Sequence, residues 1–329
     1  MADCNDLFSK FYTEVNLGSD KKDTLRTSRN AIREKIKKHF KEQLGVTQPK
    51  FYGQGSYMMN TMINPLDGEY DIDDGVYLQH VDATAEEEEW PKPATVHGWI
   101  VDATKGHTST PPSDKDTCVR VVYQAQYHID LPIYVMKDGT PRLAHKTQGW
   151  IKSDPRAMTT WFQNQVGSHG AHGDQLRRVV QYLKAWKDFS QGDTKLPSGL
   201  VLTILACTYF TPEEERDDSA LVGTASAIHT ALSEDFSVLK PVTPYEDLLS
   251  DWSVTRRDNF LSKLKTMVNR GAGALEEEDK TEASEKWIKV FGDRFPKYEP
   301  PAGGGATEMA KRTTAPAILG NHGRSAHSR

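Results

Sequence analysis

A chain of 329 residues, with 37% hydrophobic and 26% charged residues, is long enough for one bilobed domain or two ordinary ones and excludes a disordered or fibrous protein. The net charge of −5 comes with no run of Lys or Arg longer than two residues, so we expect no strong binding to nucleic acid. Three widely spaced cysteines predict neither a disulfide framework nor a zinc site, and we expect a cytoplasmic protein without membrane association.

The first predicted element is a helix over residues 19–44, ended by Gly45. Its apolar side chains recur at spacings of seven, four and four residues: Leu25, Ile32, Ile36 and Phe40. Lys and Arg fill the opposite face, which we interpret as solvated. Residues 46–52 then form a short strand candidate that leads into the loop Gly53-Gln54-Gly55-Ser56-Tyr57.

An acidic strand follows this loop. Aromatic and β-branched residues over 70–78 indicate the strand, and alternate side chains of a strand share a face, so Asp71 and Asp73 project together. Two adjacent carboxylates repel each other unless a cation lies between them, and Mg²⁺ typically binds through one or two carboxylates and substrate phosphates. The backbone amides and the hydroxyl of the Gly-Ser loop suit those phosphates. This stretch therefore predicts a metal-dependent phosphoryl or nucleotidyl transfer site.

Two further strands are predicted over residues 118–123 and 127–134, which are rich in Val, Ile and Tyr. Asp130 lies within the second, between apolar neighbours, and a buried carboxylate is unfavourable unless it is paired or bound to a metal. We interpret it as the third member of the acidic cluster; the alternative is an edge-strand residue that faces water. His128 shares its face, where it is either a substrate contact or a hydrogen-bonded structural residue.

From residue 155 onward helical patterns dominate. A strong amphipathic helix covers residues 175–188 and carries Lys184 away from its most apolar line, where a surface position and contact with a triphosphate are both open. Ser198 suits the N-cap of the next helix. Later helices are predicted over residues 220–239, 245–252 and 256–270, with a last one after residues 276–279.

The three acids together suit a two-metal site, in which one ion activates the attacking hydroxyl and the other stabilises the leaving pyrophosphate. Asp71 and Asp73 would bind the ion at the triphosphate. With Asp130 they would bind the ion that lowers the pKa of the acceptor hydroxyl. The Gly-Ser loop and Lys184 would bind the phosphates.

This combination resembles the polymerase-β-like nucleotidyltransferases and, more closely, the bacterial CD-NTases, the cGAS/DncV-like enzymes that make cyclic oligonucleotide signals. The matching segments, in chain order, are Gly53-Gln54-Gly55-Ser56-Tyr57, Tyr70-Asp71-Ile72-Asp73, Tyr127-His128-Ile129-Asp130-Leu131-Pro132, Ser153-Asp154-Pro155, Leu183-Lys184-Ala185-Trp186-Lys187, Leu196-Pro197-Ser198 and residues 287–296. Asp74 departs from the pattern as a fourth acid on the alternate face, which argues against metal binding by its side chain. The zinc-ribbon insert of the animal relative is absent.

The resemblance implies an α+β, bilobed polymerase-β-like nucleotidyltransferase fold. A catalytic lobe with a mixed sheet and an N-terminal helix would cover residues 1–150. A helical lobe over residues 151–298 would complete the nucleotide cleft. Residues 299–329, rich in Pro, Gly, Ala, Ser and Thr, would form a disordered tail.

The resemblance also implies residue roles. Metal binding and catalysis are implied for Asp71, Asp73 and Asp130, with two Mg²⁺ ions, or Mn²⁺, as cofactors. Nucleotide binding is implied for Gln54, Gly55, Ser56, Tyr57, Ser153, Asp154, Lys184, Ser198 and Asp247.

The predicted function is template-independent synthesis of a cyclic di- or trinucleotide second messenger from NTPs, with ATP, GTP or both as substrates. The messenger would act on a downstream effector in anti-phage defence, and a conjugation machinery acting on the tail is a second hypothesis. One alternative is a nucleotidyltransferase that does not cyclise its product but makes linear oligonucleotides or modifies RNA or protein. Another is a binding or scaffold protein that has lost the chemistry.

Overall fold

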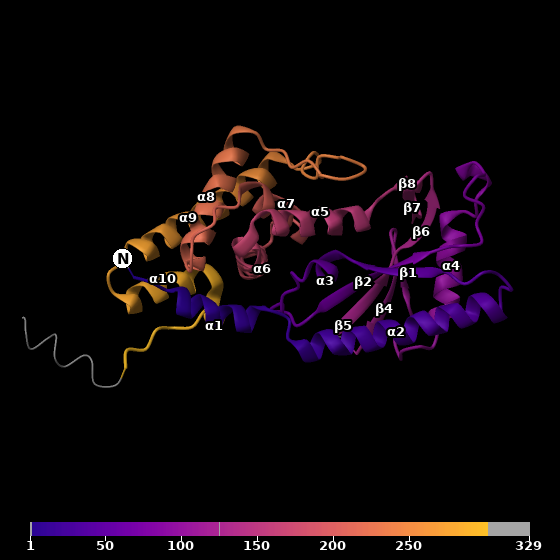
Figure 1. Cartoon of the computed structure of the whole chain (residues 1–329), viewed down its shortest axis with the longest axis horizontal. Coiled ribbons are helices and arrows are strands. Elements are labelled where there is room, and N and C mark those ends of the chain that lie inside the picture. Colours follow the sequence, from indigo (N-terminus) through magenta and orange to yellow (C-terminus); the bar gives the residue numbers. More distant parts are fainter. Residues whose placement is uncertain (1, 125, 302–329) are drawn as a thin grey trace, which may run out of the picture.

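A mixed β-sheet and a group of helices lie side by side as two lobes in the computed structural model, which describes residues 2–124 and 126–301 (Figure 1). Within these residues the sheet has eight strands in the order β3-β4-β5-β2-β6-β7-β8, and β1 pairs with β2. The strands are β1 (Lys50–Gln54), β2 (Tyr70–Tyr77), β3 (Ser113–Asp114), β4 (Val119–Tyr123), β5 (Tyr127–Leu131), β6 (Ile133–Lys137), β7 (Thr140–His145) and β8 (Gly149–Lys152). The predicted α+β architecture, a mixed-sheet lobe beside a helical lobe, is confirmed.

Strand β2 lies inside this sheet and pairs in parallel with β5 and β6 and antiparallel with β1. Ile72 and Val76 pack into an apolar cluster with helices α2 (Ser19–Glu42) and α4 (Pro93–Thr104), and neither side chain is more than 1% exposed. Because side chains alternate along a strand, Asp71 and Asp73 point to the opposite face. The burial of one face of β2 thus presents the two acids on the other.

Helix α2 confirms the helix predicted over residues 19–44, and its four periodic apolar residues are fully buried. Its other face is not wholly solvated, because Arg33 reaches Asp74, which is fully buried. Nε of Arg33 donates to Oδ2 of Asp74 at 2.7 Å, and a second hydrogen bond joins the other nitrogen and oxygen. This pairing confirms that Asp74 faces away from the other acids.

The helical lobe is built around α6 (Gly173–Ser190), which contacts several of the other helices. Leu176, Val180 and Leu183 of α6 are fully buried in the apolar cluster of this lobe. The surrounding helices are α1 (Asn5–Val15), α5 (Pro155–Ser168), α7 (Gly199–Tyr209), α8 (Asp217–Glu234), α9 (Val254–Glu276) and α10 (Lys280–Phe291). In Figure 1 α5 runs from this lobe toward the edge of the sheet at β8.

Helix α1 was not predicted and belongs to the helical lobe, although residues 1–150 were predicted to form the catalytic lobe together. Leu7, Phe8, Phe11 and Val15 are buried in the cluster that contains α6 and α10, not in the cluster beneath the sheet. Phe8 makes edge-to-face contacts with Tyr182 and Trp287, with ring centroids 5.2 and 4.8 Å apart. The chain therefore starts in one lobe and crosses to the other before α2 (Figure 1). The boundary near residue 150 stays a prediction.

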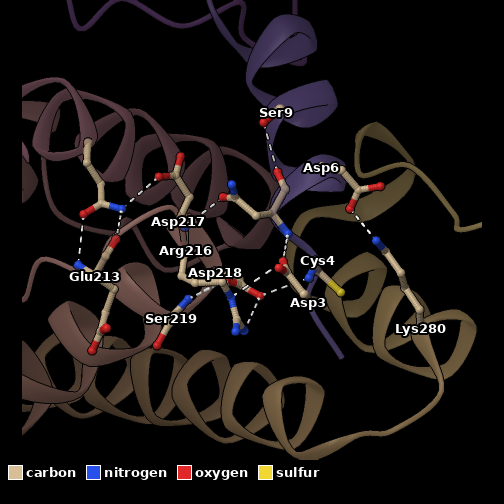
Figure 2. A network of polar contacts seen from close by, with 12 residues as sticks. Asp3, Cys4, Asp6, Ser9, Glu213, Arg216, Asp217, Asp218, Ser219 and Lys280 are labelled. Atoms are coloured by element: carbon tan, nitrogen blue, oxygen red, sulfur yellow. Dashed lines mark hydrogen bonds and ion pairs between the residues drawn. The ribbon is translucent and has the colours of Figure 1, made fainter. Parts of the chain in front are cut away.

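Polar contacts also fasten α1 to the helical lobe (Figure 2). The backbone amide of Asp217 donates to Oδ1 of Asn5 at 3.0 Å, and the amide of Cys4 donates to Oδ2 of Asp218 at 3.3 Å. Lys280, the first residue of α10, pairs with Asp6 of α1. The two amide contacts satisfy backbone N–H groups at the starts of α8 and α1, and the ion pair links α1 to α10.

Two predicted helices differ from the structure. Helix α8 covers Asp217–Glu234, so it ends before residue 239. Residues 245–252 form turns rather than a helix, because Oδ1 of Asp247 accepts hydrogen bonds from the amides of Val238 at 2.9 Å and Leu249 at 3.0 Å and so folds the segment back on itself. Within the described part of the chain, no helix combines the length and apolarity required to cross a bilayer. The predicted tail falls almost entirely on residues 302–329, outside the described residues.

Candidate active site

The parallel pairing of β2 with β5 brings the predicted acids together. Asp71 lies opposite His128 and Asp73 lies opposite Asp130 in the strand register. Residues two apart share a face, so these four side chains form two adjacent rows on the face directed away from α2. One ligand atom each from Asp71, His128 and Asp130 lies within 4.8 Å of the other two. We refer to the four residues as the acid row.

Burial and mutual repulsion act on the carboxylates of the acid row. Burial raises the pKa of Asp73 well above its ordinary value, and the nearby charges of Asp71 and Asp130 raise it further. Burial likewise raises the pKa of Asp71, against the favourable charge of His128. Both shifts mean that the positive side chains nearby do not offset the burial and mutual repulsion of the ionised acids, and a divalent cation would add the missing positive charge. The oxygen-rich donor set suits a hard cation such as Mg²⁺.

Arg120 on β4 provides one counter-charge, and this residue was not predicted from the sequence. Its Nε and Nη2 atoms donate to the two oxygens of Asp130, each at 2.8 Å. Arg120 lies opposite Asp130 in the antiparallel pairing of β4 with β5. A charged residue between Val119 and Val121 in an apolar strand was the signal that could have found it.

The Gly-Ser loop touches the acid row directly. Gly55 has φ of +68°, and a Cβ atom placed on it would collide with the carboxylate of Asp73. Only glycine therefore allows the backbone of the loop to lie against this acid. The structure thus gives Gly55 a steric role that the loop motif alone did not specify.

The other loop residues are placed in different directions. Ser56 lines the cleft described below. Gln54 is buried, and its Nε2 donates to the hydroxyl of Tyr134 at 3.2 Å. Tyr57 packs into the apolar cluster beneath the sheet, with the guanidinium of Arg29 5.7 Å from its ring centroid. Tyr57 does not line either of the clefts described below, and its role in nucleotide binding stays a prediction.

Two clefts flank the acid row between the lobes. The first has a volume of about 540 Å³ and is lined by Asp71 and Lys184. The second has a volume of about 470 Å³ and is lined by Asp130 and Ser153. Gly55, Met59, Asp73 and Leu200 line both clefts. Asp73 thus lies where the two clefts meet.

Lys184 lines the first cleft from the helical lobe, and its contact with a triphosphate stays a prediction. Its Nζ donates to the carbonyl oxygen and to Oγ1 of Thr61, both at 3.0 Å. Burial lowers the pKa of Lys184 to about 8. Lys187 lines the same cleft and was not assigned a role from the sequence; its spacing of three from Lys184 on a helix was the available signal.

Three of the predicted nucleotide contacts have structural roles. Ser198 is the N-cap of α7 and accepts a hydrogen bond from the amide of Val201 at 3.3 Å. Asp154 is the N-cap of α5 and accepts from the amide of Ala157 at 2.9 Å. Asp247 organises its own turn, as described above. Capping accounts for the positions of these side chains, so their roles in nucleotide binding stay predictions.

Lys240 was also missed. It lines the second cleft, and its Nζ lies 3.7 Å from Oε1 of Glu246. The amide of Lys240 donates to the carbonyl oxygen of Glu246 at 2.9 Å, so the folded-back segment around Asp247 holds the lysine in place. No periodic pattern in this Pro-containing segment signals such a position.

Comparison with known proteins identifies similar chains. Residues 49–134 match the family described as "Cyclic GMP-AMP synthase DncV-like, nucleotidyltransferase domain". The cyclic GMP-AMP synthase of Escherichia albertii is 30% identical over 224 residues, which cover 65% of this chain and 48% of that protein. The cyclic GMP-AMP synthase of Vibrio cholerae is 26% identical over 326 residues, which cover 78% of this chain and 70% of that protein. The chain thus spans about half of the first relative and more of the second.

The fold agrees with these matches. A crystal structure of Vibrio cholerae DncV cyclic AMP-GMP synthase aligns with a TM-score of 0.74 at 20% identity, over 88% of this chain and 97% of that one. The family match covers β1, the Gly-Ser loop and all residues of the acid row. The resemblance stated from the sequence is therefore confirmed: residues 49–134 match the DncV-like nucleotidyltransferase domain, and the chain as a whole is similar to the bacterial CD-NTases, the cGAS/DncV-like nucleotidyltransferases.

Proposed function

We propose that this protein joins two NTPs into a cyclic dinucleotide without a template. The observation that carries the proposal is the position of the acid row between two clefts of about 540 and 470 Å³. Each volume lies in the range of sites for small ligands, roughly 300–1,000 Å³. A donor nucleotide in the first cleft and an acceptor in the second would meet at Asp73, which lines both.

The first cleft suits a donor triphosphate. Lys184 and Lys187 bring two positive side chains from the helical lobe, and Ser56 brings a hydroxyl from the opposite wall. Two positive side chains at this position would stabilise the charge that accumulates on a leaving pyrophosphate. Lys184 is held by two hydrogen bonds to Thr61, so little reorganisation is needed when phosphate binds.

Asp71, Asp73 and Asp130 would hold two Mg²⁺ ions, or Mn²⁺, at the acid row. The bound ions would lower the pKa of the acceptor hydroxyl and neutralise the departing phosphates. Asp130 borders the second cleft and would orient the acceptor hydroxyl toward the donor phosphate. Arg120 would hold the Asp130 carboxylate in a fixed orientation through two hydrogen bonds.

The relatives favour a cyclic product made from ATP and GTP. The similar proteins of Escherichia albertii and Vibrio cholerae are named cyclic GMP-AMP synthases. One solved structure of the Vibrio cholerae enzyme contains the linear intermediate 5′ pppA(3′,5′)pG. For this chain we propose the same course. A linear dinucleotide forms first, its free triphosphate then occupies the first cleft, and a second bond closes the ring.

The biological setting is also a proposal. The cyclic dinucleotide would signal to a downstream effector during phage infection, and the tail beyond residue 301 would be the substrate of a conjugation machinery. Both can be tested in cells that carry the native gene neighbourhood. The double variant Asp71→Asn with Asp73→Asn is expected to remove protection against phage, and mass spectrometry of the tail is expected to detect an adduct.

The decisive experiment for the activity is incubation of the purified protein with radiolabelled ATP and GTP and Mg²⁺ or Mn²⁺. A product that resists phosphatase and has the mass of a cyclic dinucleotide supports the proposal. Linear oligomers alone, or label on RNA or protein, would point to a nucleotidyltransferase that does not cyclise. Nucleotide binding without turnover would indicate a protein that has lost the chemistry.

A further inference from the structure

One residue of the acid row, His128, carries an imidazole instead of a carboxylate. We infer that His128 supplies a nitrogen ligand to a divalent cation held by Asp71 and Asp130, and that the site therefore prefers Mn²⁺ to Mg²⁺. The inference rests on the proposed function in one respect, the presence of a catalytic cation at the acid row.

The geometry of His128 meets the requirement for a shared ion. Its partner in the strand register is Asp71, and its Nε2 lies 4.0 Å from Oδ2 of Asp130. The ligand atoms of the three residues are all within 4.8 Å of one another. Ligands bound at about 2.1 Å to one octahedral ion lie about 3 Å apart when adjacent and about 4 Å apart when opposite. Small side-chain rotations are enough to bring the three atoms onto one ion.

His128 also lacks the contacts of a structural histidine. Within residues 2–124 and 126–301, neither of its ring nitrogens makes a hydrogen bond, and its side chain is 14% exposed. His97 shows what such contacts look like here, because its Nδ1 lies 2.7 Å from Oδ1 of Asp114 and its Nε2 lies 2.9 Å from the carbonyl oxygen of Ala144. Of the two roles left open for His128, the hydrogen-bonded structural one lacks the contacts that it requires. His97 is satisfied by protein groups, whereas His128 has nitrogen atoms left for a ligand.

Charge and donor type set the metal preference. Arg120 already neutralises part of the charge of Asp130 by binding both of its oxygens. A neutral imidazole adds a donor to the site without adding a further negative charge. Mg²⁺ binds oxygen and dehydrates reluctantly, whereas transition-metal ions accept imidazole nitrogen. A mixed set of two carboxylates and one imidazole therefore favours Mn²⁺ over Mg²⁺ more strongly than three carboxylates would.

The test uses the full-length protein and MnCl₂ alone, without nucleotide. Titration followed by the electron paramagnetic resonance signal of free Mn²⁺ gives the affinity. Electron spin-echo spectroscopy of the bound ion detects coupling to ¹⁴N. We expect such coupling in the unmodified protein and its loss in His128→Asn. The Kd for Mn²⁺ should rise at least about 10-fold in that variant. Competition by Mg²⁺ should show a nearly unchanged affinity for Mg²⁺.

Two control variants show whether the effect is specific to His128. His229→Asn, on α8 of the helical lobe, should change neither the coupling nor the Kd. Asp71→Asn should weaken the binding of both ions, because it removes an oxygen ligand from the same site. Thermal unfolding of each variant establishes that it has folded.

Absence of ¹⁴N coupling in the unmodified protein would overturn the inference, and that measurement needs no variant. An unchanged Kd for Mn²⁺ in folded His128→Asn would also overturn it. The proposed function fails separately: coupling without synthesis of a cyclic dinucleotide leaves the His128 assignment standing, whereas synthesis without coupling leaves the enzyme and removes the ligand.

Discussion

Asp130 binds Arg120 through both carboxylate oxygens, and each of these oxygens keeps a lone pair for a second partner. Pairing with Arg120 is therefore compatible with a metal ligand on the other side of the carboxylate. The individual side chain is fixed by the arginine, and its remaining lone pairs are available at the border of the second cleft. This arrangement makes Asp130 the residue whose replacement tests the candidate site most directly.

We expect Asp130→Asn to lower the rate of nucleotide synthesis by about 10²–10⁴-fold, because the amide can neither bind a metal as strongly nor accept a proton. Asp102→Asn, at an exposed position of α4, is the matched control and should keep full activity. Product formation is measured at saturating ATP and GTP, with thermal unfolding to establish folding. Substantial activity in Asp130→Asn would mean that the third acid has been misassigned.

Lys184 gives a prediction on pH. Burial lowers its pKa to about 8, so the side chain loses its charge as the pH rises through about 8, and binding of a triphosphate then requires uptake of a proton. The affinity for a non-reactive ATP analogue should fall by up to about tenfold per pH unit above that value. Lys184→Arg keeps its charge in this range and should bind with an affinity that does not depend on pH. A constant affinity of the unmodified protein between about pH 7 and pH 9 would contradict the prediction.

At the scale of elements, the turn from β1 into α3 (Gly55–Met59) joins the first strand to the acid row. The backbone at Gly55 adopts φ of +68° and lies against the carboxylate of Asp73. The turn thus sets how closely the loop and β2 approach each other. Adding a methyl group at Gly55, and at a glycine with the same backbone angle elsewhere, separates the effect of backbone strain from the effect of a collision with Asp73.

Gly55→Ala should nearly abolish synthesis, because the added Cβ collides with the Asp73 carboxylate. Gly45→Ala is the matched control, since Gly45 has the same φ of +68° and open space around the position of a Cβ. Both variants should lose about 1–2 kcal/mol of unfolding free energy from the left-handed conformation. Urea denaturation and a synthesis assay distinguish the two effects. Equal activity of both variants would show that the contact between Gly55 and Asp73 has no functional role.

Elements with a clear period could be predicted from the sequence, and those held by side-chain contacts could not. The spacing of Leu25 and Ile32 predicted α2, and the alternation along β2 predicted the shared face of Asp71 and Asp73. The helix predicted over residues 245–252 failed because the carboxylate of Asp247 binds distant backbone amides instead. Lys240 could not be found for the same reason. Its position depends on that folded-back segment and not on any repeat.

At the scale of the whole molecule, the two lobes differ in what could be foreseen. The acid row follows from strand alternation and from one charged residue in an apolar strand. Which lobe α1 packs against depends on contacts between residues more than 150 positions apart in the sequence, such as Phe8 with Tyr182. Apolar periodicity in residues 7–15 could have indicated a helix there, but it could not have indicated which lobe the helix covers. Those contacts also contribute to the stability of the helical lobe.

Asp217 in this lobe gives a prediction on stability. Burial would raise the pKa of its carboxyl group, but hydrogen bonds from Arg178, Gln175 and Tyr182 outweigh burial, and the pKa is lowered. We expect Asp217→Asn to lower the unfolding free energy at neutral pH by about 3 kcal/mol, because it leaves partners of a buried charge unsatisfied. A lowered pKa in the folded state stabilises the protein above the pKa of the unfolded state, about 4, and this contribution is lost as the pH falls through the folded pKa. The difference between the two proteins should therefore shrink below about pH 4.

The control for Asp217 is Asp174→Asn, which breaks an ion pair with Arg177 in which the side chain of Asp174 is 79% exposed. Exposed pairs contribute about 1 kcal/mol or less, so this variant should unfold nearly like the original protein. Urea denaturation at pH 7 and at a pH well below about 4 measures both differences. Equal losses in the two variants would show that the buried network around Asp217 does not stabilise the lobe.

The pairing of β2 with β5 has a consequence for the proposed two-step reaction. The spacing between Asp71, Asp73 and Asp130 is set by main-chain hydrogen bonds within one sheet, whereas Lys184 and Lys187 approach from the other lobe. A rigid-body movement between the lobes would change the contacts of the two lysines with the triphosphate and leave the spacing of the acids unaltered. In the proposed reaction, pyrophosphate would leave and the linear intermediate would turn around between the clefts during such a movement. The three acids would keep their arrangement for the second bond-forming step.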